Sequence, residues 1–108
     1  MTNAILLERE RGLLTLRLNR PDKKNALTRA MYSHLADALK QADTDPDINA
    51  VLITGSAECF TAGNDIADFL MQPPTSLDSP VFHFMLSLLE CRKPVIAAVA
   101  GLALGGGC

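Results

Sequence analysis

Two short apolar segments constrain the fold of this chain more than any other feature of its sequence. Residues 50–54 read Ala-Val-Leu-Ile-Thr, and residues 95–100 read Val-Ile-Ala-Ala-Val-Ala. Strands that are apolar on both faces are typical of a parallel sheet whose two faces are covered. Segments with helical periodicity precede both of them. Strands that alternate with helices predict an α/β fold with right-handed crossovers.

The other periodic segments give the order of the elements. Leucine alternates with polar residues in residues 13–19, which predicts a hairpin with residues 5–10 across Arg11-Gly12. Thr28 is expected to cap an amphipathic helix that ends near Asp43. A short helix is expected near Asp65, after a loop at residues 55–63, and a mostly buried helix at residues 81–91. The predicted order is β-β-α-β-α-β, followed by a glycine-rich turn.

Composition and charge exclude several classes of function. The chain has 108 residues and a formal net charge of -2, so we expect no affinity for nucleic acid or an anionic membrane surface. Its longest apolar stretch, residues 95–104, is too short to span a bilayer. The N-terminal residues do not resemble a signal peptide, which favours a cytoplasmic location.

The cysteines do not predict a metal site. Cys59, Cys91 and Cys108 are widely spaced and form no CxxC pair, and His34 and His83 complete no ligand pattern. We expect reduced thiols that serve as small packing residues, and no bound metal.

Two glycine turns, each just after an apolar strand, are the strongest candidates for chemistry. In the first turn Gly63 permits a sharp bend, Asp65 can cap the next helix, and the Asn64 N–H has no obligatory partner. The second turn is Gly-Gly-Gly at residues 105–107, where a helix N-terminus would favour negative charge. Two such donors could stabilise the developing charge on a thioester oxygen, by about 2.7–4 kcal/mol per donor.

Each turn also has a simpler interpretation. A single Ala-Gly-Asn-Asp is usually only a turn, and a run of three glycines is often only a tight or flexible loop. A phosphate loop is a weak alternative, because residues 101–105 do not fit GxGxxG and no Gly-Lys-Ser/Thr follows.

Three segments in a fixed order are more specific than either turn. They are LNRPDKKNAL at residues 18–27, FTAGNDI at residues 60–66 and KPVIAAVAGLALGGGC at residues 93–108. Together they resemble the enoyl-CoA hydratase/isomerase (crotonase) superfamily over essentially the whole chain. The resemblance implies a ββα spiral core, of which residues 1–108 would be the N-terminal part of one domain. It also implies acyl-CoA substrates and a homotrimer or dimer of trimers, with coenzyme A as part of the substrate and no other cofactor.

The resemblance also assigns roles to individual residues. The N–H groups of Asn64 and Gly106 would form the oxyanion hole. The other expected substrate-binding residues are Lys23, Lys24, Ala26 and Leu27 in the loop that binds coenzyme A, and Ala62, Gly63, Asp65 and Ile66 along the acyl thioester. Lys24 could equally be a solvated loop cation, and the side chain of Asn25 could simply bond its own turn.

One departure from the family concerns proton transfer. A hydratase carries a glutamate immediately after Gly-Gly-Gly-Cys and a second one further along, and neither lies within these 108 residues. Asp65 and Asp68 are expected to be a helix cap and a surface residue. We therefore expect an N-terminal portion of a longer enzyme, inactive alone, with residues 72–80 as an exposed connection that shapes the acyl pocket.

Four functions are compatible with the sequence. The first is an enoyl-CoA hydratase, and the second is a Δ3,Δ2-enoyl-CoA isomerase, which would use a single, differently placed base. The third is a coenzyme A-binding module without chemistry. The fourth is a plain α/β domain in which the glycines serve only the turns.

Overall fold

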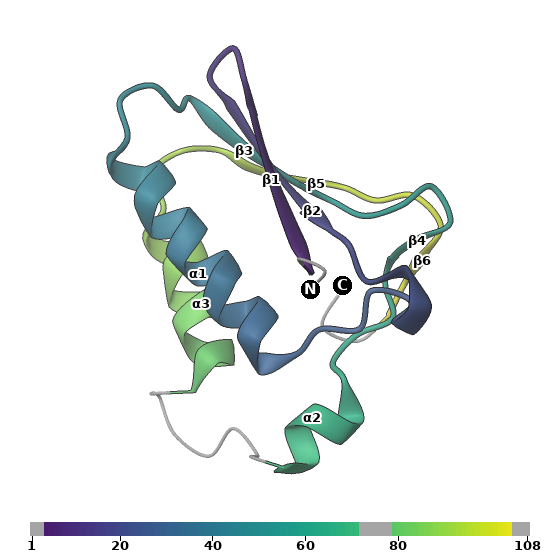
Figure 1. Cartoon of the computed structure of the whole chain (residues 1–108). Coiled ribbons are helices and arrows are strands. Elements are labelled where there is room, and N and C mark those ends of the chain that lie inside the picture. The colour runs from purple at the N-terminus through teal and green to yellow at the C-terminus, as the bar shows by residue number, and fades with distance from the viewer. Residues whose placement is uncertain (1–3, 72–78, 105–108) are drawn as a thin grey trace.

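The computed structural model describes residues 4–71 and 79–104 of the chain (Figure 1). The strands are β1 (Ile5–Glu10), β2 (Leu13–Leu18), β3 (Ala50–Thr54), β4 (Cys59–Thr61), β5 (Val95–Ala98) and β6 (Leu102–Ala103). The helices are the 3-10 turn η1 (Pro21–Lys23), α1 (Arg29–Thr44), α2 (Ile66–Met71) and α3 (Pro80–Glu90).

A four-stranded sheet in the order β1-β2-β3-β5 forms the base of the fold. The predicted hairpin is confirmed: β1 and β2 pair antiparallel, with Leu7 opposite Leu16. Arg11 and Gly12 both have positive φ, at 50° and 82°, and two such residues match the twist of a tight hairpin. The predicted parallel pairing is confirmed as well, because β3 runs parallel to both β2 and β5.

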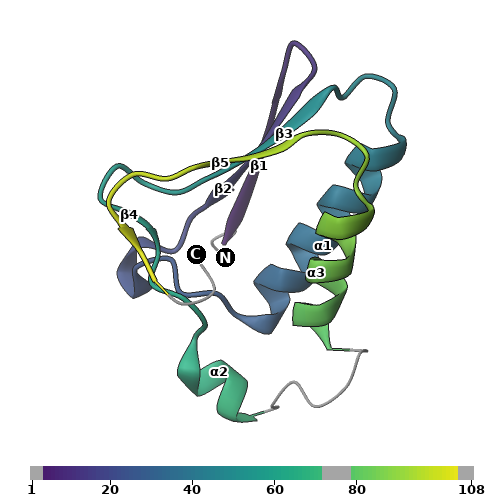
Figure 2. The same ribbon diagram turned by 180° about the vertical axis from the view of Figure 1, so that it is seen from behind.

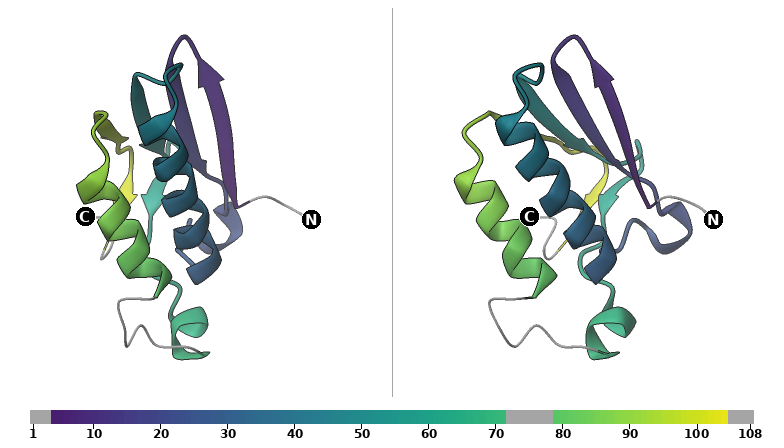
Figure 3. Two further views of the ribbon diagram at one scale, coloured as in Figure 1. Left: turned by 90° about the vertical axis from the view of Figure 1, so that its left-hand side faces the viewer. Right: turned by 60° about the vertical axis from the view of Figure 1, so that its left-hand side comes forward.

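Helices α1 and α3 lie side by side in one layer beside the sheet (Figure 3). The predicted cap of α1 is confirmed, since the Thr28 side chain accepts a hydrogen bond from the Met31 N–H at 3.2 Å. The buried side of α1 carries Met31, Tyr32, Leu35, Ala36, Ala38, Leu39 and Ala42. These side chains and those of β2 and β3 form the main core.

The prediction that residues 81–91 form a mostly buried helix is wrong about burial. The helix itself is present as α3, but only Val81 and Ser87 in it are buried, and Leu89 is 82% exposed. The physical reason is that α3 packs mainly against α1, along one side, and no other described element meets it as extensively.

Two strand predictions also need correction. The strand expected at residues 95–100 ends at Ala98, and Ile96 on it is 51% exposed, so its two faces are not both covered within the described residues. The loop expected at residues 55–63 contains β4, which pairs with β6 in a separate two-stranded parallel sheet. Strands of two or three residues are too short to show periodicity in a sequence.

Neither a membrane-spanning helix nor a metal-binding cluster occurs in residues 4–71 and 79–104. None of the helices there has the length and apolar character that crossing a lipid bilayer requires. In the same ranges, His, Cys, Asp and Glu side chains form no group of three or more that could hold a metal ion.

Candidate active site

The two segments predicted to bind substrate lie at the same edge of the main sheet. Residues 20–27, here called the 20–27 loop, follow β2, and the turn at residues 62–65 follows β3 and β4. Because β2 and β3 are parallel, their carboxyl ends meet at one edge, which is where ligands bind in most α/β sheets. Figure 2 shows η1 of this loop beside β4, on the side away from α1 and α3.

The side chain of Asn25 fastens the 20–27 loop to β4. Asn25 is only 2% exposed, and its Nδ2 donates to the carbonyl oxygens of Cys59 at 3.1 Å and Phe60 at 3.2 Å. Its Oδ1 accepts from the Arg20 N–H at 2.8 Å, so the predicted bond within its own turn is confirmed. The Thr61 hydroxyl donates to the Asn25 carbonyl at 2.7 Å. The three bonds to β4 fix the loop relative to the strand that leads into the glycine turn, and the fourth closes the loop on itself.

A partly buried ion pair links the same loop to the turn. The Arg20 guanidinium donates to Asp65 Oδ2 at 2.8 Å and to the Ala26 carbonyl at 2.9 Å. The Arg20 and Asp65 side chains are 23% and 16% exposed. Because one guanidinium contacts both segments, the loop and the turn are held as a single unit.

Asp65 serves as the helix cap that the sequence predicts. Its Oδ1 accepts from the Asp68 N–H at 3.0 Å in the first turn of α2. This backbone hydrogen bond, followed by the hydrogen bond from Arg20, holds the pKa of Asp65 below its usual value.

Asp68, predicted to be a surface residue, is partly exposed and also pairs with α1. Its carboxylate accepts from the Arg29 N–H at 2.8 Å and pairs with the Arg29 side chain at 3.2 Å. Both carboxylates of this region therefore have structural partners.

The backbone of the turn presents one outward donor. Leu27 and Asn64 form an isolated parallel β-bridge. The Leu27 N–H donates to the Gly63 carbonyl, and the Asp65 N–H donates to the Leu27 carbonyl, both at 2.8 Å. In this pattern the middle residue turns its own N–H away from the bridging strand. The Asn64 N–H accordingly has no hydrogen-bond partner among the described residues.

The neighbours of Asn64 are firmly held. Gly63 has φ of 100°, a backbone conformation that favours glycine, and its N–H donates to the Thr61 hydroxyl at 3.1 Å. The Ala62 N–H donates to the Lys24 carbonyl at 3.0 Å. The Asn64 side chain is held from α1, because Tyr32 donates its hydroxyl hydrogen to Asn64 Oδ1. The Asn64 N–H therefore lies in a turn whose neighbouring N–H groups are all hydrogen-bonded within the protein.

The strand that leads toward the second glycine turn runs beside β4. Thr61 pairs with Ala103, and the Leu104 N–H donates to the Thr61 carbonyl at 3.1 Å. Gly106, the second predicted oxyanion donor, lies outside the described residues.

The other predicted substrate-binding residues differ in exposure. Lys23 and Lys24 are exposed, Ala26 is partly exposed and Leu27 is buried. Ile66, the first residue of α2, is 74% exposed. The structure thus brings the Lys23–Leu27 segment and the turn together, with the lysines open to solvent.

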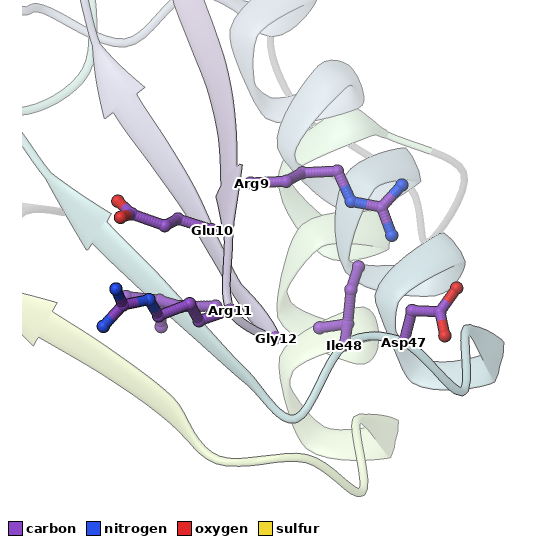
Figure 4. A pocket seen from close by; sticks show the side chains of 7 residues that line it. Arg9, Glu10, Arg11, Gly12, Asp47 and Ile48 are labelled. Atoms are coloured by element: carbon purple, nitrogen blue, oxygen red, sulfur yellow. The ribbon is translucent and has the colours of Figure 1, made fainter.

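Two cavities of the described structure are alternative candidate sites. One, of about 240 Å³, lies at the hairpin end, away from the 20–27 loop, and is lined by Arg9, Glu10, Arg11, Gly12, Leu13, Asp47 and Ile48 (Figure 4). Its two arginine side chains point in opposite directions, and Arg9 is paired with Asp45. Its charged groups do not converge on a common point, so it is a weak candidate.

The second cavity is larger and mostly apolar. It measures about 520 Å³, lies among β2, β3, β5, α1 and α3, and includes Leu27, Phe60 and Thr61 in its lining. Leu27 pairs with the turn and Phe60 and Thr61 precede it, so the cavity offers apolar space near the turn.

Four positioning residues lie outside the predicted set of site residues: Arg20, Asn25, Tyr32 and Thr61. Their partners are distant in sequence, 32 residues away for Tyr32 and Asn64 and 45 residues away for Arg20 and Asp65. A short-range pattern gives no signal for such pairs. Asn25 alone offers a local clue, because its φ of 56° is one that asparagine tolerates better than most residues.

Comparisons with known proteins agree on one family. The family described as enoyl-CoA hydratase/isomerase matches residues 8–108. A probable enoyl-CoA hydratase of Mycobacterium leprae is 46% identical over 90% of this chain and 37% of the relative. The 1,2-epoxyphenylacetyl-CoA isomerase of Escherichia coli is 38% identical over 99% of this chain and 44% of the relative.

A solved structure agrees closely with the fold. The structure of Pseudomonas aeruginosa OdaA is 63% identical, has a TM-score of 0.94, and is matched over 98% of this chain and 43% of that one. The chain therefore spans less than half the length of each of these three proteins.

Proposed function

The chain belongs to the enoyl-CoA hydratase/isomerase family, and we propose that the protein is an enoyl-CoA hydratase, a lyase that adds water to a trans-2-enoyl-CoA. The thioester carbonyl of the substrate accepts a hydrogen bond from the Asn64 N–H. As water adds, negative charge grows on this oxygen, and a donor already in place stabilises that charge most strongly.

The observation that carries this proposal is the state of the four N–H groups from Ala62 to Asp65. Three of them are bonded within the protein, and that of Asn64 has no partner among the described residues. A donor held outward by bonded neighbours loses little freedom when it meets a ligand.

The second donor we propose is Gly106. Asn64 comes three residues after Thr61, and Gly106 comes three residues after Ala103, the residue that pairs with Thr61. This equal spacing from a paired position on parallel strands supports a shared oxygen between the two N–H groups.

The 20–27 loop binds the coenzyme A part of the substrate. The exposed cations Lys23 and Lys24 can reach phosphate groups, while Ala26 and Leu27 supply the backbone beside the turn. Leu27 supports this assignment because it bridges Asn64 directly and so joins the two parts of the proposed site.

Proton transfer needs groups other than the two aspartates near the turn. Asp65 and Asp68 are both occupied by structural hydrogen bonds. We expect the acid and base to be glutamates from outside these 108 residues. The assembly we expect is a homotrimer or a dimer of trimers, which sedimentation analysis would test.

A Δ3,Δ2-enoyl-CoA isomerase is the second candidate, because an isomerase is among the relatives that match nearly the whole chain. The two activities differ in product. Incubation with crotonyl-CoA gives loss of the conjugated double bond for a hydratase, whereas a 3-enoyl-CoA is converted to the conjugated isomer by an isomerase. A protein that binds both thioesters and converts neither is a binding module without chemistry.

The test of the donor compares two substitutions at one position. Asn64→Pro removes the N–H, whereas Asn64→Ala keeps it. We expect the proline variant to lose about 100-fold or more in kcat and the alanine variant to lose far less. Gly106→Pro should likewise abolish turnover with less effect on coenzyme A affinity. Equal activity of the two Asn64 variants, with both folded, would remove Asn64 from the role, and failure of the protein to bind crotonyl-CoA would refute the site.

A further inference from the structure

Tyr32 occupies a central position among three helices next to the proposed donor. It lies in the first turn of α1, and its side chain is 4% exposed. Its ring meets Phe69 of α2 edge-on, with ring centres 6.1 Å apart, and Phe84 of α3 at 5.4 Å. These aromatic contacts fix the ring, so its hydroxyl group has a defined position.

The hydroxyl of Tyr32 donates a hydrogen bond to the side-chain oxygen of Asn64 at 2.5 Å, its single acceptor among the described residues. Asn64 is exposed. Its Oδ1 is the only atom of this residue that forms a hydrogen bond with the described residues. The backbone bonds of Leu27 fix the peptides on both sides of Asn64 but place no restraint on its side chain.

An unrestrained asparagine would interfere with the proposed donor. Asparagine side-chain oxygens commonly accept hydrogen bonds from their own or neighbouring backbone N–H groups. If Oδ1 of Asn64 turned toward its own N–H, it would compete with the substrate oxygen for that hydrogen. The Tyr32 hydroxyl holds the oxygen on the side of α1, where it cannot do so.

We propose that Tyr32 is a positioning residue of the oxyanion site, which keeps the Asn64 N–H available by holding the Asn64 side-chain oxygen. This rests on the proposed function, since it concerns the same donor. The residue acts through Asn64, so its effect should depend on whether position 64 carries an acceptor.

The test is a double-mutant cycle with Tyr32→Phe, Asn64→Ala and the double variant. Phenylalanine keeps the ring contacts and removes only the hydroxyl, and alanine keeps the backbone N–H and removes the competing oxygen. The probe is butyryl-CoA with ¹³C at the thioester carbonyl, a saturated thioester that cannot be hydrated. Its carbonyl stretching frequency reports the hydrogen bonds to that oxygen, and its affinity is measured in parallel.

We expect Tyr32→Phe to return the carbonyl frequency part of the way toward that of the free thioester. We also expect it to weaken binding about three- to tenfold, as the loss of one well-placed hydrogen bond would. Tyr32→Phe should add nothing to the effect of Asn64→Ala when the two are combined, because the competing oxygen is then already absent. In turnover of crotonyl-CoA the loss should fall on kcat more than on KM.

Two outcomes separate the possible failures. If the original protein binds butyryl-CoA with no change in carbonyl frequency, or does not bind it, the proposed function fails and this inference fails with it. If the original protein shifts the frequency but Tyr32→Phe has the same effect in both backgrounds, Tyr32 acts through packing alone and only the inference is overturned.

A second measurement does not depend on substrate. Residues 1–108 contain one tyrosine, Tyr32, so its ionisation is measured as the part of the tyrosine ultraviolet titration that Tyr32→Phe removes. Burial raises the pKa of Tyr32. The neutral phenol donates to Asn64 and the phenolate cannot, so we expect Asn64→Ala to lower the titration midpoint. An unchanged midpoint in a folded Asn64→Ala variant would show that the bond is absent in solution and would overturn the inference.

Discussion

Replacement of Asn25 by alanine should destabilise the protein by about 3–5 kcal/mol. The side chain makes three hydrogen bonds, to the Arg20 N–H and to the carbonyl oxygens of Cys59 and Phe60. Each is worth about 0.5–1.5 kcal/mol net, and its loss leaves a poorly solvated backbone group behind. Asn25 also has φ of 56°, a conformation that costs alanine about 1 kcal/mol more than asparagine.

The two contributions can be separated with a second substitution. Asn25→Gly loses the same three hydrogen bonds but accepts the positive φ, so it should be about 1 kcal/mol less destabilising than Asn25→Ala. The matched control is Asn49→Ala, because Asn49 is exposed and only its backbone is seen to form a hydrogen bond within the described residues. The control should change stability by less than about 0.5 kcal/mol.

The assay is urea denaturation followed by far-ultraviolet circular dichroism, with the free energy of unfolding taken by linear extrapolation. Because small domains have about 5–15 kcal/mol of stability, Asn25→Ala should remain partly folded and measurable. A loss below about 1 kcal/mol, or one equal to that of Asn49→Ala, would refute the argument that Asn25 fastens the 20–27 loop to β4.

Two further predictions concern charges near the same site. The hydrogen bond from the Asp68 N–H, followed by that from Arg20, depresses the pKa of Asp65. Its contribution to stability is therefore present above the pKa it has in the unfolded chain and is lost as pH falls through the folded value. Asp65→Asn should flatten the acid side of the stability profile, and an unchanged slope would count against the link. Replacing Lys23 and Lys24 together by alanine should weaken coenzyme A binding about three- to tenfold at low salt and much less at high salt. Isothermal titration at two ionic strengths would measure this, and equal losses at both would argue against phosphate contacts.

Local signals in the sequence predict much of the fold. The alternation of leucine with polar residues predicts the β1–β2 hairpin, and the Thr28 cap predicts the start of α1. In each case the interacting groups lie within a few residues or follow a simple period, so the information is present in a short window. The parallel arrangement of β3 and β5 follows from their apolar character and the helices between the strands.

Burial of α3 and the pairing of β4 with β6 show where such signals fail. An apolar helix is expected to be covered on most sides, yet only one side of α3 meets α1, and Leu89 stays exposed. How much of an apolar surface is covered depends on which elements reach it, and composition does not specify this. Pairing between strands of two or three residues depends on where the preceding elements end.

The contacts of the proposed site also fall into those that a short stretch of sequence predicts and those that it does not. The Gly63 turn, the Asp65 cap and the motifs that identify the family can be predicted from sequence, because each depends on residues that are close together in the chain. The contacts of Asn25 with β4 and of Tyr32 with Asn64, across 34 and 32 residues, are seen only in the folded protein. Hydrogen bonds act over about 3 Å, so pairs this distant in sequence exist only once the elements that carry them have packed.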